Sequence, residues 1–292
     1  MEKRNKIIQI ILWIGFSIFC LAIIFPFCLL VSASLTDSAT LATKGYSLIP
    51  GNFDLSAYRF VFKNTDQIMR AYGVTSFYSI INMVLNVLLM AMIAYPLSAD
   101  NLKGKKYINF YLYFTMMFSG GLVPKYIIVS KYLHLNNTIW VYILPQLISP
   151  WYVFMMRTFF SGIPKEIMES ATVDGASEYR IFFQMILPLS KPVLATVALF
   201  TFLASWNDWN TALIYITDEK LYSLQYLLQS IMENINLVKQ NQMAASMTSM
   251  KDIPAETVRM AMAVVVAGPA LLVFPFFQKY FTKGLTVGAV KG

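Results

Sequence analysis

The sequence predicts an all-α membrane protein with six transmembrane helices, both termini cytoplasmic, and a cytoplasmic helix between spans four and five. The first observation is composition: 57% of the 292 residues are hydrophobic and 13% are charged. A soluble domain has roughly 45–50% apolar and about 25% charged residues. The second is six apolar stretches that reach the roughly 20 residues needed to span a bilayer. The third is the concentration of basic residues on alternate connections. An ordinary soluble enzyme, an acidic disordered chain and a disulfide scaffold are thereby excluded.

The six expected spans form one membrane domain over residues 1–292. Two of them contain interruptions, because Ser119-Gly120-Gly121 and Pro124 fall within the third and Asp208 within the fifth. Irregular backbone at membrane depth is tolerated only beside protein or a cavity. We expect the spans at residues 7–35, 72–97, 107–130, 138–160, 188–216 and 258–281.

Orientation follows from the Lys and Arg residues beside the spans, since cytoplasmic loops collect them. With the N-terminus inside, 13 of the 23 basic residues fall in short cytoplasmic segments. Both termini are therefore expected inside, together with the connection 161–187. The long connections 36–71 and 217–257 are expected outside. The second of these is rich in Gln, Asn, Met and Ser, and is either a solvated, partly disordered loop or a contact for a partner protein.

Several chemistries lack the residues that they need. Cys20 and Cys28 both lie in the first apolar stretch, and His134 is the single histidine, so we expect no disulfide framework, no metal site and no catalytic residue. The phosphate-binding pattern G-x-x-x-x-G-K-[ST] is missing; Gly104-Lys105 approaches it without the earlier glycine or the hydroxyl residue. The chain is therefore not expected to hydrolyse ATP. Basic residues stand singly between apolar stretches, which argues against a nucleic-acid partner.

The connection 161–187 has the local chemistry of two short helices that meet at an angle. Pro164 suits the first turn of a helix, and Gly175 ends that helix because it accepts a left-handed backbone. Asp174 or Ser177 can cap the next helix. Small residues at the turn allow another protein to approach closely. The alternative is a surface helix that only joins two spans.

This connection also resembles a known family. Glu169-Ser170-Ala171, then Asp174-Gly175, then Ile186-Leu187-Pro188 follow the E-A-A signature of permease subunits of binding-protein-dependent ABC importers, with Ser170 where the family usually has alanine. Three further segments resemble the carbohydrate branch, maltose-type permeases in particular. They are FSGGLVP (118–124), SWNDWNTAL (205–213) and GLTVGAVKG (284–292).

The resemblance implies that 161–187 is a coupling loop that docks on a separate ATPase. ATP and Mg would be bound by that partner, and this chain would hold no cofactor. The other implied partners are a second, different permease subunit, a second ATPase copy and an extracellular or periplasmic sugar-binding protein, in a bacterial inner or plasma membrane. ATPase coupling is assigned to Glu169, Ser170, Ala171, Asp174, Gly175, Ile186 and Pro188.

The tail 282–292 is assigned to a contact between the ATPase subunits through Gly284, Thr286, Gly288 and Lys291. The alternative is a flexible tail, since glycine is frequent there.

Three groups of residues are candidates for the substrate pathway. Asn82 and Asn86 share a helix face and serve either helix packing or the pathway. Gly120 and Gly121 mark either the pathway or a simple re-entrant bend. Aromatic faces beside amides and a carboxylate suit a sugar, but Trp is also enriched at membrane interfaces. This third group consists of Trp206, Asn207, Asp208 and Trp209.

The resulting expectation is a permease subunit of an ATP-driven importer of an oligosaccharide or modified sugar. The main alternative is an ABC importer permease for a peptide, an amino acid or a polyamine. A secondary carrier is disfavoured because the two halves show no convincing inverted repeat. A membrane-embedded enzyme is disfavoured because G-x-S-x-G and H-E-x-x-H motifs are missing.

Overall fold

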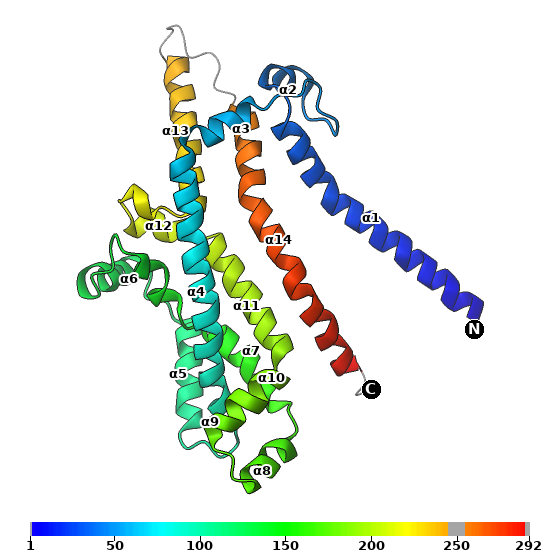
Figure 1. The fold of residues 1–292 in the computed structure, drawn as a ribbon, viewed down its shortest axis with the longest axis vertical. Coiled ribbons are helices and arrows are strands. Elements are labelled where there is room, and N and C mark those ends of the chain that lie inside the picture. The colour runs from blue at the N-terminus through cyan, green and yellow to red at the C-terminus, as the bar shows by residue number, and fades with distance from the viewer. Residues whose placement is uncertain (1, 245–254, 290–292) are drawn as a thin grey trace. The chain divides into compact units, whose positions relative to one another are not determined.

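The computed structural model describes residues 2–244 and 255–289, and over these residues the chain is helical (Figure 1). Within them, the β-type pairing consists of one isolated antiparallel bridge between Thr36 and Phe53. The chain divides into two compact units, one made of Met1–Ile68 and Leu228–Pro269 and the other of Met69–Leu227 and Ala270–Gly292. The predicted all-α class is therefore confirmed.

The first unit begins with the long helix α1 (Glu2–Ser34), which continues through Pro26. Its segment Ile8–Ser34 has a mean hydropathy of 2.7 and is long enough to cross a membrane. The connection that follows contains two short helices and a 3₁₀ turn: α2 (Ser38–Lys44), α3 (Ser56–Val61) and η1 (Phe62–Asn64).

Two other helices are long, apolar and unbroken. They are α4 (Thr65–Ser98) and α14 (Ala255–Ala289), and both contain a segment that can span a bilayer by length and composition. Pro96 sits in the last turn of α4, so the helical bond that its missing N–H removes lies at the end of the helix. With α1, these helices correspond to the first, second and sixth expected spans.

The expected third span is broken, as the glycines predicted. Helix α5 (Lys105–Met117) is followed by α6 (Leu122–Ile127) and the π-helix η2 (Ile128–Tyr132), with a bend of 111° between the two parts. Gly121 precedes α6 with φ of +86°. That left-handed conformation favours glycine, so the local sequence accounts for the turn.

The expected fourth span differs from a single helix over 138–160. The 3₁₀ turns η3 (Ile139–Tyr142) and η4 (Leu144–Gln146) meet α7 (Pro150–Ser161) at 50°. Pro145 and Pro150 both lack the N–H that a continuous helix would use, and each restricts the residue before it.

The expected fifth span over 188–216 is also divided. After α8 (Lys165–Val173), the chain forms α9 (Glu178–Ile181), η5 (Phe182–Ile186) and α10 (Leu187–Leu189), and then turns by 79° into α11 (Lys191–Trp206). Helix α12 (Asn210–Tyr215) follows after a break at 207–209. If each bent pair crosses once, the described residues supply up to six spans.

The connection 217–257 contains more regular structure than expected. A 3₁₀ turn, η6 (Glu219–Leu221), precedes the helix α13 (Leu224–Ala244). Leu224, Leu227 and Leu228 are buried at the start of α13, and this apolar anchor explains why a segment rich in amides folds as a helix. Residues 245–254 lie outside the described part of the chain.

The second unit contains two apolar clusters. One gathers side chains from α4, α7, α8, η5 and α11, with Met90, Met156 and Phe160 fully or almost fully buried. The other surrounds Tyr78 and Tyr142, whose rings stack with centroids 4.4 Å apart. Side chains of α8 and α9 pack in the first cluster, and Figure 1 shows these two helices close together.

Candidate functional site

The segment α8–α9, called the elbow below, turns through a defined helix-capping motif. Helix α8 follows Pro164 and ends at Asp174, and Gly175 has φ of +78°. The Ala176 N–H donates to the Ala171 carbonyl at 2.9 Å, and the Gly175 N–H donates to the Thr172 carbonyl at 3.0 Å. These two bonds form a Schellman motif, in which glycine supplies the left-handed residue. The predicted break at Gly175 is confirmed.

Of the two residues predicted to cap the second helix of the elbow, Ser177 does so. The Ser177 hydroxyl accepts from the Arg180 N–H at 3.4 Å, whereas Asp174 ends α8. Pro164 stands one position before α8 and does not form part of its first turn.

One face of the elbow is buried in the protein. Ile163, Ala171, Ile181 and Ile186 all belong to the apolar cluster that includes side chains of α4, α7 and α11. Ala171 and Ile186 therefore act as anchors of the elbow rather than as an exposed surface. Burial of this face fixes the elbow to the ends of three longer helices.

The remaining surface of the elbow is exposed and combines acidic, small and apolar side chains; Glu169 and Tyr179 on this surface also line the pocket described below. Glu169, Ser170, Asp174 and Gly175 are exposed, as is Pro188 further along. The Ser170 hydroxyl donates to the Ile167 carbonyl at 3.1 Å, so serine in place of alanine presents no unsatisfied donor. Val173 is 87% exposed and Tyr179 75% exposed.

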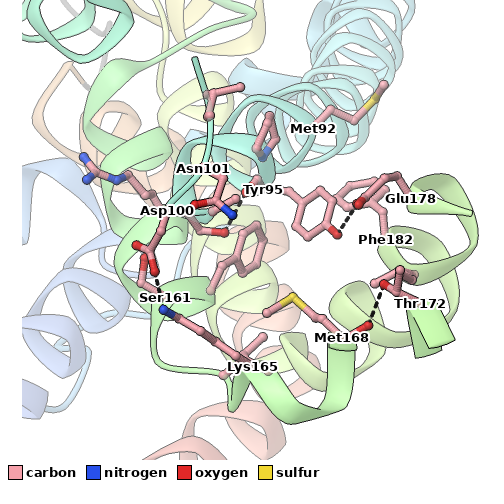
Figure 2. Close-up of a pocket in the computed structure, with 18 of the residues that line it drawn as sticks. Met92, Tyr95, Asp100, Asn101, Ser161, Lys165, Met168, Thr172, Glu178 and Phe182 are labelled. Atoms are coloured by element: carbon pink, nitrogen blue, oxygen red, sulfur yellow. Dashed lines mark hydrogen bonds and ion pairs between the residues drawn. The ribbon is translucent and has the colours of Figure 1, made fainter. Parts of the chain in front are cut away.

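A pocket of about 1050 Å³ lies between the elbow and the ends of α4 and α7 (Figure 2). Two polar pairs of residues line it. The Tyr95 hydroxyl donates to Glu178 Oε2 at 2.7 Å, and Lys165 forms an ion pair with Asp100. The hydrogen bond from Lys165 holds the pKa of the Asp100 carboxyl below its usual value and raises the pKa of the Lys165 amine.

These four pocket residues were missed from the sequence. The members of the two pairs stand 83 and 65 positions apart, so no local spacing signals either contact. The available hint is positional: Lys165 and Glu178 are the first residues of α8 and α9.

Asn82 and Asn86 are buried within the second unit. Asn82 is 1% exposed, and its Nδ2 donates to the Tyr142 carbonyl at 2.9 Å and to Ser205 Oγ at 3.1 Å. Asn86 Nδ2 donates to the Asn82 carbonyl at 2.6 Å. These bonds join α4 to η3 and α11, which favours the helix-packing interpretation of Asn82.

The third candidate group for the substrate pathway, residues 206–209, contains both buried and exposed side chains. Trp206 is buried, with ring contacts to Phe202 and Tyr72, whereas Asn207 is exposed and Trp209 is 42% exposed. Asp208 lies between them and is half-buried.

The Asp208 carboxylate is used within the chain. Its Oδ1 accepts from the Thr211 N–H at 3.0 Å, and its Oδ2 accepts from Gln146 Nε2 at 2.9 Å. These bonds tie the α11–α12 break to η4. Gln146 of η4 and Asp208 stand 62 positions apart, so no local spacing signals this contact.

The remaining predicted residues lie elsewhere. Gly120 and Gly121 occupy the turn between α5 and α6. Gly284, Thr286 and Gly288 fall in the last turns of α14, and Lys291 lies outside the described residues.

Comparison with known proteins places this geometry in a family. Residues 2–287 match the family described as the inner membrane component of binding-protein-dependent transport systems. The chain is 36% identical over 292 residues to the polygalacturonan/rhamnogalacturonan transport system permease protein YtcP of Bacillus subtilis, covering 99% of this chain and 100% of that protein. It is 31% identical over 299 residues to the arabinooligosaccharides transport system permease protein AraQ of Halalkalibacterium halodurans, covering 100% and 99%.

A solved structure has the same fold. It is that of a bacterial ABC transporter involved in the import of the acidic polysaccharide alginate. The TM-score is 0.78, with 26% sequence identity, and the match covers 95% of this chain and 97% of the other. The chain therefore belongs to the family of binding-protein-dependent transport system inner membrane components, which are transport permeases and not ATPases.

Proposed function

We propose that this chain is one of two different permease subunits of an ATP-driven carbohydrate importer. Residues 1–292 act as one permease domain that crosses a bacterial inner or plasma membrane six times, with both termini cytoplasmic. The chain forms half of the translocation pathway. Its partners are the second permease, two ATPase subunits that bind ATP and Mg, and a sugar-binding protein outside.

The observation that carries this proposal is the two-faced elbow. Its buried face is fixed to the ends of α4, α7 and α11, while Glu169, at the edge of the pocket, and Ser170 and Gly175 remain exposed. A force applied to the exposed face by an ATPase is therefore passed to three long helices. Close-packed interiors transmit strain, so the displacement reaches these helices where the elbow is packed against them.

The small residues and the acid have separate roles in that contact. Ser170 and Gly175 allow the ATPase backbone to approach closely. Glu169 meets basic or polar groups of the ATPase, where a charge-assisted hydrogen bond contributes about 1.5–3 kcal/mol. Val173 and Tyr179 add exposed apolar area on the same elbow.

Carbohydrate is the substrate class that the relatives support. Two permeases with at least 31% identity are named for polygalacturonan or rhamnogalacturonan and for arabino-oligosaccharides. In this chain, Trp209 and Asn207 offer an exposed aromatic face and an amide at the α11–α12 break. Such groups suit a sugar ring and its hydroxyls. A permease for a peptide, an amino acid or a polyamine is the alternative.

Reconstituted uptake tests the proposal. The complete complex in proteoliposomes is given labelled oligogalacturonide, arabino-oligosaccharide and a dipeptide, each with the cognate binding protein and internal ATP. We expect ATP-dependent uptake of at least one saccharide and none of the dipeptide. A non-hydrolysable ATP analogue is the control. Uptake that persists with the analogue, or uptake of the dipeptide alone, would contradict the assignment.

A further inference from the structure

The elbow is not packed solidly against α4 along its whole length. The pocket of about 1050 Å³ lies between them, and its wall includes Tyr95, Asp100, Lys165 and Glu178 (Figure 2). Where packing is interrupted in this way, the contacts that span the gap decide how far the two sides move together. Among the described residues, two polar side-chain contacts cross this pocket: Tyr95 of α4 with Glu178, and Asp100, which follows α4, with Lys165.

The Tyr95 contact holds the elbow at two points. Its hydroxyl donates to Glu178 Oε2 at 2.7 Å. The centroid of its ring lies 5.4 Å from the centroid of the Phe182 ring, with 39° between the ring planes. Glu178 and Phe182 are four positions apart on α9 and η5, so they share one face. Phe182 is itself buried in the apolar cluster. Tyr95 of α4 therefore contacts two residues that lie about one helical turn apart on α9 and η5.

The Asp100 contact has no ring packing beside it. Both side chains are largely exposed, 65% for Lys165 and 64% for Asp100. An exposed ion pair is screened by water and salt and contributes little to holding two elements together. Both polar contacts are exposed, but Tyr95 also packs its ring on the buried Phe182, so the two contacts provide a matched pair for experiment.

We propose that Tyr95 is a positioning residue that couples movement of the elbow to the end of α4, through its hydroxyl bond to Glu178 and its ring contact with Phe182. This inference rests on the proposed function, because it requires an ATPase that acts on the elbow. Loss of the hydroxyl bond leaves the elbow in place on its apolar base. The elbow can then move into the pocket without moving α4, so part of each ATP-driven displacement does not reach α4.

The test measures the number of ATP molecules hydrolysed per sugar imported by the complete complex in proteoliposomes. Tyr95→Phe removes the hydroxyl and keeps the ring on Phe182. Glu178→Ala removes the acceptor, whereas Glu178→Gln keeps an acceptor oxygen. Asp100→Asn is the control at the exposed pair. Assembly and thermal unfolding of each complex are recorded in parallel.

We expect Tyr95→Phe and Glu178→Ala each to raise the ATP-per-sugar ratio about two- to tenfold, the range into which one net hydrogen bond converts. The variant that carries both Tyr95→Phe and Glu178→Ala should have the same ratio as each single variant, because both substitutions remove the same hydrogen bond. Glu178→Gln and Asp100→Asn should resemble the wild type. Assembly should be unaffected, and any fall in unfolding temperature should be small; a merely structural role for Tyr95 would lower the unfolding temperature without raising the ATP-per-sugar ratio.

A wild-type ratio in Tyr95→Phe would overturn the inference while leaving the proposed function intact. An equal rise in Asp100→Asn would do the same, because it would indicate general loosening of the elbow. Failure of the wild-type complex to link ATP hydrolysis to uptake would instead refute the proposed function and, with it, this inference.

Discussion

Gly175 shows at the scale of one residue why the elbow depends on its sequence. Its φ is +78°, and a Cβ built there would meet no atom within 4 Å. A side chain is therefore disfavoured by the backbone conformation and not by crowding inside this chain. The left-handed conformation costs an L-residue roughly 1–2 kcal/mol.

Gly175→Ala should consequently loosen the turn. Hydrogen exchange at the Ala176 amide should become about five- to thirtyfold faster, which corresponds to 1–2 kcal/mol of lost local stability. Gly175→Asn should have a smaller effect, because asparagine tolerates this conformation better. Gly73 in α4 also has open space around it but no positive φ, so Gly73→Ala is the control and should not accelerate exchange. Unchanged exchange in Gly175→Ala would contradict this explanation.

Local chemistry predicted the residues whose partners are close in sequence. Gly175 and Ser177 act within a few positions, and their roles as helix terminator and cap follow from residue type. The bond between Tyr95 and Glu178 could not be predicted, since 83 positions separate its members. Only the packing of α9 against α4 brings them together.

At the scale of helices, apolar composition predicted where the long apolar helices lie but not whether each expected span is continuous. Pro145 and Pro150 coincide with the 50° bend in the expected fourth span. Proline alone does not decide the matter, because α1 continues through Pro26. At the fifth span, the break after Trp206 coincides with a bond from the Thr211 N–H to the Asp208 carboxylate. That bond offers the backbone an alternative to the helical ladder.

Asp208 should therefore stabilise the broken span. Asp208→Ala removes the acceptor for the Thr211 N–H and for Gln146, and we expect it to reduce the free energy of unfolding by about 1–2 kcal/mol. Asp208→Asn retains one acceptor oxygen and should lose less than half of that. Thermal and denaturant unfolding of the purified complex measure both effects.

Trp209→Ala is the control for this series. The Trp209 side chain is 42% exposed, so its removal should change unfolding little. We expect the same variant to reduce sugar uptake, in line with its proposed place on the pathway. If Asp208→Asn proves as destabilising as Asp208→Ala, the negative charge and not the acceptor oxygen is what the fold requires.

At the scale of the whole chain, the long apolar helices leave much surface uncovered. None of the most apolar window of α1 is buried, and 11% of that of α14 is buried, against 33% for α4. Composition predicted a membrane protein because such surface needs lipid or other subunits around it. It could not predict which surface meets which subunit, because those contacts involve residues of other chains.

The most direct test of the central claim, that the elbow is where ATP hydrolysis is coupled to transport, is Glu169→Lys in the reconstituted complex. The measurement is ATPase activity in proteoliposomes with and without the sugar-loaded binding protein. Asp66→Lys, a charge reversal at an exposed residue in the first turn of α4, is the control. We expect Glu169→Lys to insert normally and to lose stimulation about tenfold or more, as loss of a charge-assisted hydrogen bond implies. The control should respond like the wild type. Wild-type stimulation in Glu169→Lys would show that the elbow only connects two spans, and would contradict the account.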